Sequence, residues 1–173
     1  MATPQRRPWL ALFEPDIPGN FGAALRLAAC LDVELHVVEP CGFPLDDRRL
    51  KRAGLDYAAA AGLVRHADFA AFRTAAGREV RRLVLLSTKA STPYHRFAYR
   101  PGDVLLAGRE SAGVPDAVAA SCGAAVRIPL KSGLRSLNVV VAAGMALGQC
   151  MASQGLFPGD AERGDEEGDH LDE

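Results

Sequence analysis

Short apolar runs alternate with longer stretches of helical periodicity along most of this chain. The apolar runs predict strands at 9–13, 34–38, 82–86, 104–107 and 125–128. The stretches between them predict helices at 21–31, 46–53 and 68–76, a further helix starting near Pro115, and a last helix at 137–151. Because strands alternate with helices, we expect an α/β fold with an open, mostly parallel sheet and helices on both of its faces.

The last predicted helix, 137–151, is apolar almost all round, so we expect it to be buried on most of its faces. It either packs under the sheet or belongs to the interface of a homodimer. We favour the homodimer, because this helix contains several small residues that permit close backbone approach: Ala142, Ala143, Gly144, Ala146 and Gly148.

Composition divides the 173 residues into one domain, 9–152, with a polar extension at 1–8 and an acidic, glycine-containing tail at 153–173 that we expect to be disordered. The tail holds eight of the 21 acidic residues and one of the 20 basic ones, so residues 1–152 carry 19 bases against 13 acids, a net charge of +6. A basic body suits a polyanionic partner such as nucleic acid. A solvated surface of mixed charge is the alternative.

Several common chemistries find no support in the sequence. No GxGxxG follows the first strand, and neither GxxxxGK[ST] nor GxSxG occurs. The histidines and cysteines lack metal-ligand spacing, and the cysteines lie in or beside apolar stretches, which predicts buried free thiols and no metal site: Cys30, Cys41, Cys122 and Cys150. No apolar run reaches the ~18 residues of a membrane span, and residues 1–8 lack a signal-peptide core, so we expect a cytoplasmic protein without membrane contact.

Polar loops containing glycine follow several of the predicted strands. Residues 108–115 (GRESAGVP) follow one strand, and residues 128–138 (IPLKSGLRSLN) follow the next. Since ligands bind at the carboxyl ends of the strands in open α/β sheets, these loops predict a ligand pocket.

Five polar side chains of these loops and of the first helix are candidates for its chemistry: Asn20, Arg26, Glu110, Ser136 and Asn138. Each has a structural alternative. Asn20, Ser136 and Asn138 could cap helices, Glu110 could cap the helix after its loop, and Arg26 could be a surface charge. Their common position near strand ends favours a shared site.

Motifs in a fixed order carry a resemblance to a known family. They are 18–22 (PGNFG) with Arg26, 39–43 (EPCGF), 52–57 (RAGLDY), 108–110 (GRE), 128–129 (IP) and 135–138 (RSLN). In this order they resemble the SPOUT RNA methyltransferases over about residues 9–151, and most of all the members that act on the wobble position of tRNA. The chain departs from that pattern at Ala23, Arg109 and Gly148.

The resemblance implies a C-terminal trefoil knot, a homodimer, and binding of S-adenosylmethionine without a metal. It implies that the cofactor is held at Leu86, Gly108, Ile128 and Ser136 and their neighbours Thr88, Leu130 and Leu137. It gives catalytic or pocket-shaping roles to Asn20, Arg26, Glu110, Ser136 and Asn138.

The implied activity is 2'-O-methylation of the wobble cytidine or modified uridine in the tRNA anticodon loop. We expect Arg26 to clamp a phosphate and contact the 2'-hydroxyl, because a guanidinium stays protonated and makes a poor base. The anticodon stem-loop is expected to contact the basic cluster Arg48, Arg49, Lys51 and Arg52, whose alternative is a solvated helix face. Two other hypotheses are a related methylase acting on ribosomal RNA or another tRNA site, and a non-catalytic RNA-binding module on the same fold.

Overall fold

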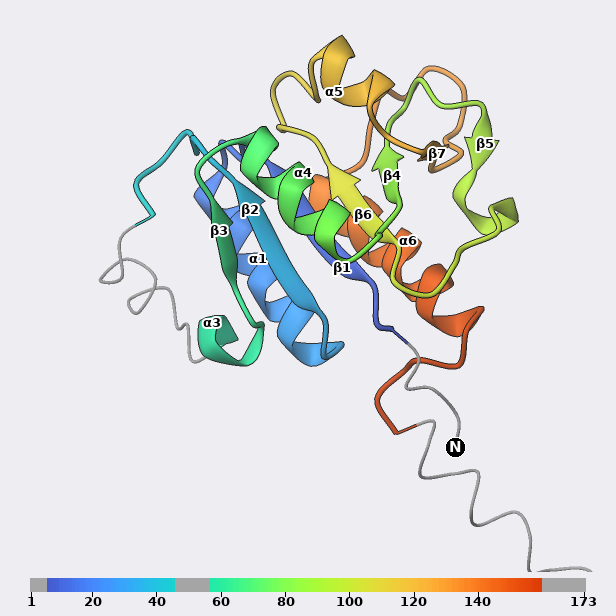
Figure 1. The fold of residues 1–173 in the computed structure, drawn as a ribbon. Coiled ribbons are helices and arrows are strands. Elements are labelled where there is room, and N and C mark those ends of the chain that lie inside the picture. Colours follow the sequence, from blue (N-terminus) through green and yellow to red (C-terminus); the bar gives the residue numbers. More distant parts are fainter. Residues whose placement is uncertain (1–5, 46–56, 160–173) are drawn as a thin grey trace, which may run out of the picture.

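The computed structural model describes residues 6–45 and 57–159, which form an open sheet of seven strands (Figure 1). The strands lie in the order β3 (Val64–His66), β2 (Glu34–Val38), β1 (Trp9–Phe13), β6 (Val104–Ala107), β4 (Leu83–Leu86), β7 (Ala124–Arg127) and β5 (Thr92–Pro93). Every neighbouring pair is parallel. The prediction of an open parallel α/β sheet is confirmed.

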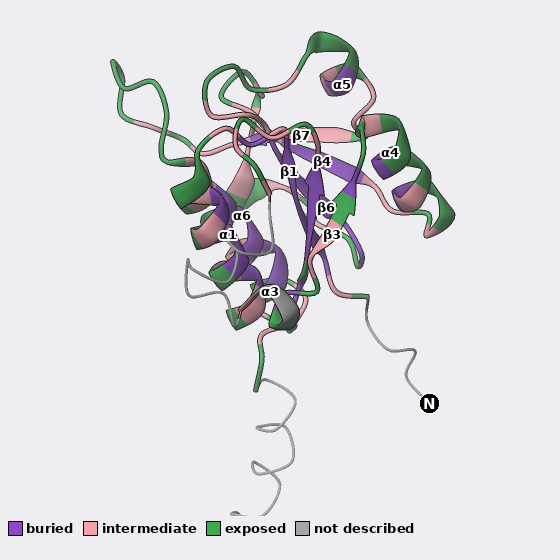
Figure 2. Ribbon diagram, turned by 90° about the vertical axis from the view of Figure 1, so that its left-hand side faces the viewer, coloured by how far each residue is buried: buried purple, intermediate pink, exposed green. Residues whose placement is uncertain are grey.

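Helices cover both faces of this sheet (Figure 2). On one face lie α1 (Pro18–Cys30), α3 (Tyr57–Ala60) and α6 (Val139–Ala152), and on the other lie α4 (Phe69–Arg78) and α5 (Asp116–Ala120). Side chains of β1 alternate between the two layers: Leu10 and Leu12 join the core under α1 and α6, whereas Trp9, Ala11 and Phe13 join the core under α4. Because both faces are covered, the strands read as continuous apolar runs.

The sequence prediction missed the two edge strands. β3 has three residues and β5 has two, which is too short for a periodic pattern to show. It also missed the short helix α3 and the 3-10 turn η1 (Tyr94–Arg96). The predicted helix at 46–53, with its basic cluster, lies outside the described residues.

The first helix begins earlier than predicted, and Asn20 is not its N-cap. Ile17 holds the cap position, and Pro18 opens the helix, where its fixed φ and missing N–H are favourable. Asn20 therefore lies inside the first turn, and its side chain is available for contacts elsewhere. At the last helix the structural alternative given for Asn138 holds, because its side chain accepts hydrogen bonds from the backbone N–H groups of Val140 and Val141.

The last helix is buried on one side and half-buried over most of the rest, and its exposed residues are Val141, Met145 and Ala152. One side of α6 packs into the core through Ala143, Ala146, Leu147, Cys150 and Met151. The other side leaves Val141 and Met145, one turn apart, 51% and 37% exposed. Apolar composition alone does not distinguish a helix buried in its own core from one whose outer face is free for a partner.

Both ends of the described chain pack against the domain. Arg7 donates hydrogen bonds to the backbone oxygens of Leu31 (3.2 Å) and Leu156 (3.0 Å), and Leu156 is 8% exposed. Packing therefore extends past residue 152, where the sequence placed the start of the tail. The division into extension, domain and tail, and the trefoil knot, stay predictions. No helix in the described part of the chain has both the length and the apolar character needed to span a bilayer.

The four cysteines are free, but they are not all buried as predicted. Cys150 is buried, and burial raises the pKa of its thiol to about 12. Cys41 is half-buried with its pKa raised to about 11, mainly by burial, whereas Cys30 is exposed. Within residues 6–45 and 57–159, no three His, Cys, Asp or Glu side chains gather as a metal site would require.

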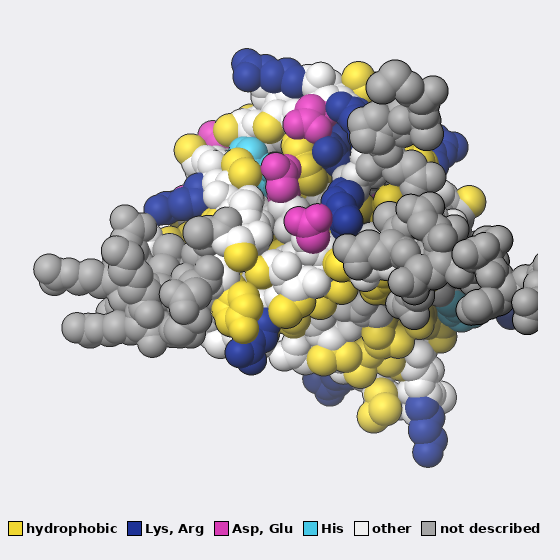
Figure 3. Space-filling model, turned by 90° about the horizontal axis from the view of Figure 1, so that it is seen from below, with side chains coloured by type: hydrophobic (Ala, Val, Ile, Leu, Met, Phe, Trp, Pro, Cys, Tyr) yellow, Lys and Arg dark blue, Asp and Glu magenta, His cyan; other side chains and the backbone are white. Residues whose placement is uncertain are grey.

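Ion pairs gather near the amino ends of the strands. Each joins an arginine to a carboxylate: Arg7 with Asp32 (3.3 Å), Arg81 with Glu79 (2.7 Å) and Arg82 with Asp103 (2.7 Å). Figure 3, which views the molecule from below, shows acidic side chains adjacent to Lys and Arg side chains. Much of the positive charge at this end of the sheet is therefore neutralised within the chain.

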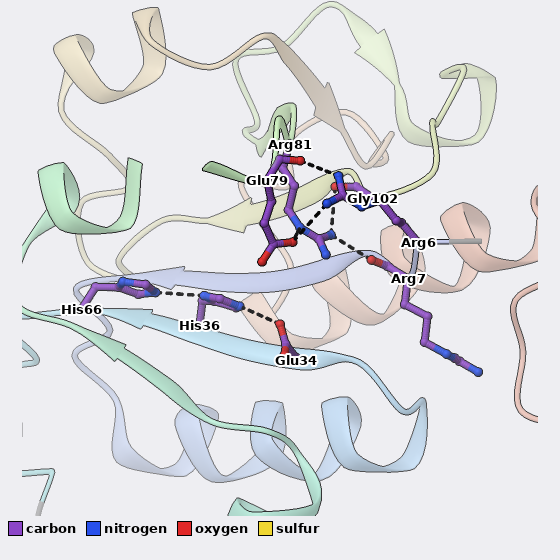
Figure 4. Close-up of polar contacts among 8 residues, drawn as sticks. All are labelled: Arg6, Arg7, Glu34, His36, His66, Glu79, Arg81 and Gly102. Carbon is purple, nitrogen blue, oxygen red and sulfur yellow. Dashed lines mark hydrogen bonds and ion pairs between the residues drawn. The ribbon is translucent and has the colours of Figure 1, made fainter. Parts of the chain in front are cut away.

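A buried pair of histidines lies beside this network, on β2 and β3 (Figure 4). Nδ1 of His36 lies 2.9 Å from Nε2 of His66, and Nε2 of His36 lies 3.3 Å from a carboxylate oxygen of Glu34. The ring of Trp9 stacks on the ring of His36, with 3.8 Å between the two ring centres. Burial, followed by the charges of His66 and Arg81, lowers the pKa of His36 from 6.5 to about 3, and burial lowers the pKa of His66.

These two histidines predict a loss of stability in mild acid. The unfolded chain binds protons near pH 6.5, whereas folded His36 stays neutral until about pH 3. Between about pH 3 and pH 6.5 the unfolded state therefore binds more protons than the folded state. The free energy of unfolding falls as the pH drops below 6.5. In urea titrations from pH 7 to 5, His36→Gln should show a shallower decline than the parent chain, and His95→Gln, at an exposed histidine, should show the parent slope. Equal slopes for all three would contradict this account.

Candidate functional site

A cavity of about 690 Å³ opens at the carboxyl ends of β6, β4 and β7. Three loops form most of its wall, one following each of these neighbouring strands. Apolar lining comes from side chains such as Leu85, Val126 and Val139, and polar lining from the loops. Its volume lies within the range of about 300–1,000 Å³ that is typical of small-molecule sites.

All seven residues that were predicted to hold the cofactor line this one cavity: Leu86, Thr88, Gly108, Ile128, Leu130, Ser136 and Leu137. They come from segments up to 51 positions apart in the sequence, and the parallel order of β6, β4 and β7 brings the segments together. Their roles toward a ligand stay predictions.

The structure brings four of the five predicted catalytic residues to the same cavity and leaves one outside. Asn20, Glu110, Ser136 and Asn138 line it. Arg26 does not belong to the lining, because it follows Asn20 by six helical residues, about 9 Å along the axis. The predicted RNA-binding residues Arg48, Arg49, Lys51 and Arg52 lie outside the described residues.

Arg26 is exposed and lies against an aromatic ring. Its guanidinium lies 5.0 Å from the centre of the Tyr57 ring, and its Nη2 is 3.5 Å from the Tyr57 hydroxyl. A cation over a ring face gains a modest attraction, so Tyr57 restricts the directions in which Arg26 points.

Three side chains of the cavity form a directed chain of hydrogen bonds. The Glu110 carboxylate accepts from the backbone N–H of Asp16 (3.0 Å) and from the Asn20 side-chain amide (3.0 Å). The Asn20 oxygen accepts from the Asn138 amide (2.9 Å), and the Asn138 oxygen caps α6. Glu110 does not cap α5, as the sequence alternative had it, because Pro115 holds that position.

The carboxylate sets the direction of this chain. An ionised Glu can only accept hydrogen bonds, so the Asn20 amide must present its NH2 group to Glu110 and its oxygen to Asn138. Asn138 must then present its own oxygen to the first turn of α6. One carboxyl group after β6 thereby fixes the side-chain orientations that join α1, α6 and the cavity.

Two further contacts tie the loop after β1 to the loop after β6, and the sequence analysis missed both. Arg109 forms an ion pair with Glu14 and donates from Nε to its backbone oxygen (3.2 Å), and the Ser111 hydroxyl donates to Asp16. In the sequence, only the acidic residues at the end of β1 could have indicated these contacts, because their partners lie 95 residues away.

Gly108 is required by close packing of its loop. A Cβ atom added there would lie 2.6 Å from the carbonyl carbon of Gly113 and 2.8 Å from its Cα, closer than real Cβ atoms come. The bridge between Arg109 and Gly113 holds the two ends of this loop together. Only glycine at position 108 therefore lets the loop fold back on itself beside the cavity.

Gly108→Ala should displace the 109–113 loop and weaken binding of S-adenosylmethionine about 5- to 150-fold in calorimetric titrations, since overpacking costs about 1–3 kcal/mol. The matched control is Gly77→Ala on α4, where an added Cβ meets nothing within 4 Å. Equal affinity of Gly108→Ala and the parent chain would show that the cavity does not bind this ligand.

Comparisons with known proteins show the family to which the chain belongs. Residues 8–148 match the model of the SpoU rRNA Methylase family. A tRNA (cytidine(34)-2'-O)-methyltransferase of Beijerinckia indica is 58% identical over 86% of this chain and 92% of its own length. A solved structure concerned with "the 2-OH methylation of C/U34 on tRNA" is 39% identical, with a TM-score of 0.77 over 84% of this chain and 95% of that one.

A third relative carries a cofactor. It is an "AdoMet bound rRNA methyltransferase" from Sinorhizobium meliloti, 27% identical, with a TM-score of 0.76 over 88% of this chain and 59% of that one.

Proposed function

Because the chain belongs to the SpoU rRNA methylase family, we propose that it transfers a methyl group from S-adenosylmethionine to the 2'-hydroxyl of the wobble nucleotide of tRNA, a cytidine or modified uridine. One observation carries this proposal. The residues expected to bind the cofactor and four of the five expected to shape catalysis meet at a single cavity at the carboxyl edge of the sheet. The relative that is 58% identical bears the name of this activity.

The cavity fits S-adenosylmethionine in size and in lining. When bound, the cofactor supplies a methyl group on a positively charged sulfur, which departs as a neutral thioether. Leu86, Ile128, Leu130 and Leu137 offer apolar surface to its adenosine, and the backbone at Gly108 permits close approach of its polar groups. A metal is not needed for this chemistry, because the sulfonium is already a strong electrophile.

The chain's own residues position the acceptor hydroxyl. Asn20, Ser136 and Asn138 offer polar groups at the cavity, and Glu110 fixes the orientation of the two amides. Alignment of the attacking oxygen, methyl carbon and sulfur accounts for most of the rate gain in such a transfer. Arg26 holds a phosphate of the RNA and donates a hydrogen bond to the hydroxyl, while a phosphate oxygen or water accepts the proton.

Pairing of two chains in a homodimer would explain two features of the single chain, an exposed apolar surface and the position of Arg26 outside its own cavity. An apolar surface is exposed at Ile17 (45%), Leu134 (66%), Leu137 (39%), Val141 (51%) and Met145 (37%), from the start of α1 to the outer side of α6. Val141 and Met145 lie one turn apart on the outer side of α6, and exposed apolar side chains grouped in this way mark interaction sites. Arg26 lies on α1 outside its own cavity, so pairing of two chains through these helices offers it a place near the partner's site.

Transfer to tRNA is tested by incubating the protein with labelled methyl donor and with total tRNA from a strain that lacks this protein. The labelled nucleotide is then mapped. The proposal predicts label on the ribose of nucleotide 34. Label in ribosomal RNA or at another tRNA position would favour a different SpoU specificity. Calorimetry without any binding of S-adenosylmethionine would favour a non-catalytic RNA-binding module. The cytoplasmic location follows from the presence of tRNA there.

A further inference from the structure

Most cations of the described chain are used in internal contacts. Nine of the fifteen described Arg and Lys side chains take part in an ion pair, a hydrogen bond or a ring contact. The six that form none within residues 6–45 and 57–159 are Arg78, Lys89, Arg96, Arg100, Lys131 and Arg135. An exposed cation without a partner is the kind of group that binds an external anion.

Three of these six belong to two of the three loops that line the cavity, the loops after β4 and β7. Lys89 is itself part of the lining, in the loop after β4. Lys131 and Arg135 lie in the loop after β7, which contributes Leu130 and Ser136 to the same cavity. All three side chains belong to exposed residues. We call Lys89, Lys131 and Arg135 the basic rim.

The two loop segments that contain the basic rim carry positive charge alone, although Glu110 and Asp116 line the same cavity from the β6–α5 segment. Neither 87–91 nor 127–138 contains an Asp or Glu. The two loops also touch, because Nε of Arg127 donates to the backbone oxygen of Ser91 (3.4 Å). This contrasts with the amino ends of the strands, where arginines pair with Asp32, Glu79 and Asp103.

We propose that the basic rim binds backbone phosphates of the RNA strand on either side of the nucleotide whose ribose enters the cavity. This inference rests on the proposed function and adds the surface that holds the substrate. Phosphates adjoin every ribose, so a cationic rim at the mouth of a ribose-binding cavity contacts them whatever the base sequence. Neutralising phosphates also releases counterions, which makes the binding salt-dependent.

The test measures binding of a tRNA transcript across a salt series, for the parent chain, each single Gln variant of the rim, and the triple variant Lys89→Gln, Lys131→Gln, Arg135→Gln. Each lost contact should reduce the slope of log affinity against log salt by about 0.7, and so by about 2 for the triple variant. Affinity at 0.1 M salt should fall about fivefold for each side chain. The matched control is Arg78→Gln, an exposed, unpaired cation at the end of α4.

S-adenosylmethionine affinity is measured by calorimetry on the single variants Lys131→Gln and Arg135→Gln, whose side chains are not part of the cavity lining. It checks that the cavity is intact and should stay within twofold of the parent value. A triple variant with the parent slope, or a control variant that lowers the slope as much as Arg135→Gln does, overturns the proposal. Failure of the proposed function looks different, because the parent chain would then methylate no tRNA at all. The binding measurement does not depend on turnover and still reports on the rim.

Discussion

Glu110→Gln should lower methyl transfer about 10- to 100-fold although it changes one atom. A glutamine offers one oxygen, whereas two donors need an acceptor: the Asp16 N–H and the Asn20 amide. If Asn20 turns its amide over, its NH2 group faces that of Asn138, and if Asn138 turns as well, α6 loses its cap. One unsatisfied donor costs about 1–3 kcal/mol wherever it ends up. Initial rates at saturating tRNA and cofactor measure the effect.

A compensating change makes this prediction specific. When Asn20→Asp is combined with Glu110→Gln, the glutamine amide introduced at position 110 donates to the new carboxylate at position 20, which also accepts from Asn138. The glutamine oxygen at position 110 still accepts from the Asp16 N–H. The double variant should therefore recover most of the activity that either single variant loses. A double variant that is no better than the worse single one would refute the directed chain of hydrogen bonds.

Arg26→Lys should lower methyl transfer about 100-fold while binding of S-adenosylmethionine stays unchanged. Lysine keeps the charge but loses the planar fork that can hold a phosphate and a hydroxyl together. Removing one hydrogen-bond donor that is positioned toward charge developing in the transition state typically lowers kcat by a factor of about 100 to 1,000. Because Arg26 lies outside the cofactor cavity, the cofactor affinity serves as the internal reference.

Arg78→Lys, the same exchange at an exposed and unpaired arginine on α4, is the control and should transfer methyl groups at the parent rate. If Arg26→Lys retained near full turnover, the clamp geometry assigned to the guanidinium would be wrong, and positive charge alone would account for its part in the reaction.

Much of the fold follows from local patterns. The strands β1, β2, β4 and β6 are buried runs of four or five mostly apolar residues, and such runs are visible in the sequence because helices cover both faces of the sheet. β3 and β5 are shorter than any periodicity, and parallel pairing with longer neighbours specifies them. That pairing is a tertiary property, so the edge strands escape a local prediction.

The site shows the same division. Loops at strand ends predict a shared cavity for Gly108, Ile128 and Ser136, and all three line one cavity in the structure, because parallel strands end at one edge. The contact partners of the loop residues could not be predicted from the sequence, because Arg109 pairs with Glu14, which lies 95 positions away. A helix cap was the structural alternative for Asn20, but Pro18 starts that helix two positions earlier, and the Asn20 amide contacts Glu110.

In the proposed reaction one cavity, bounded by the loops after β4, β6 and β7, receives the methyl donor. Amide chemical-shift mapping by NMR locates the donor on the 18.3 kDa chain during titration with S-adenosylmethionine. We expect the largest shifts at the amides of Leu86, Gly108 and Ile128. If the resonances of all three stay unmoved, the donor does not bind in this cavity.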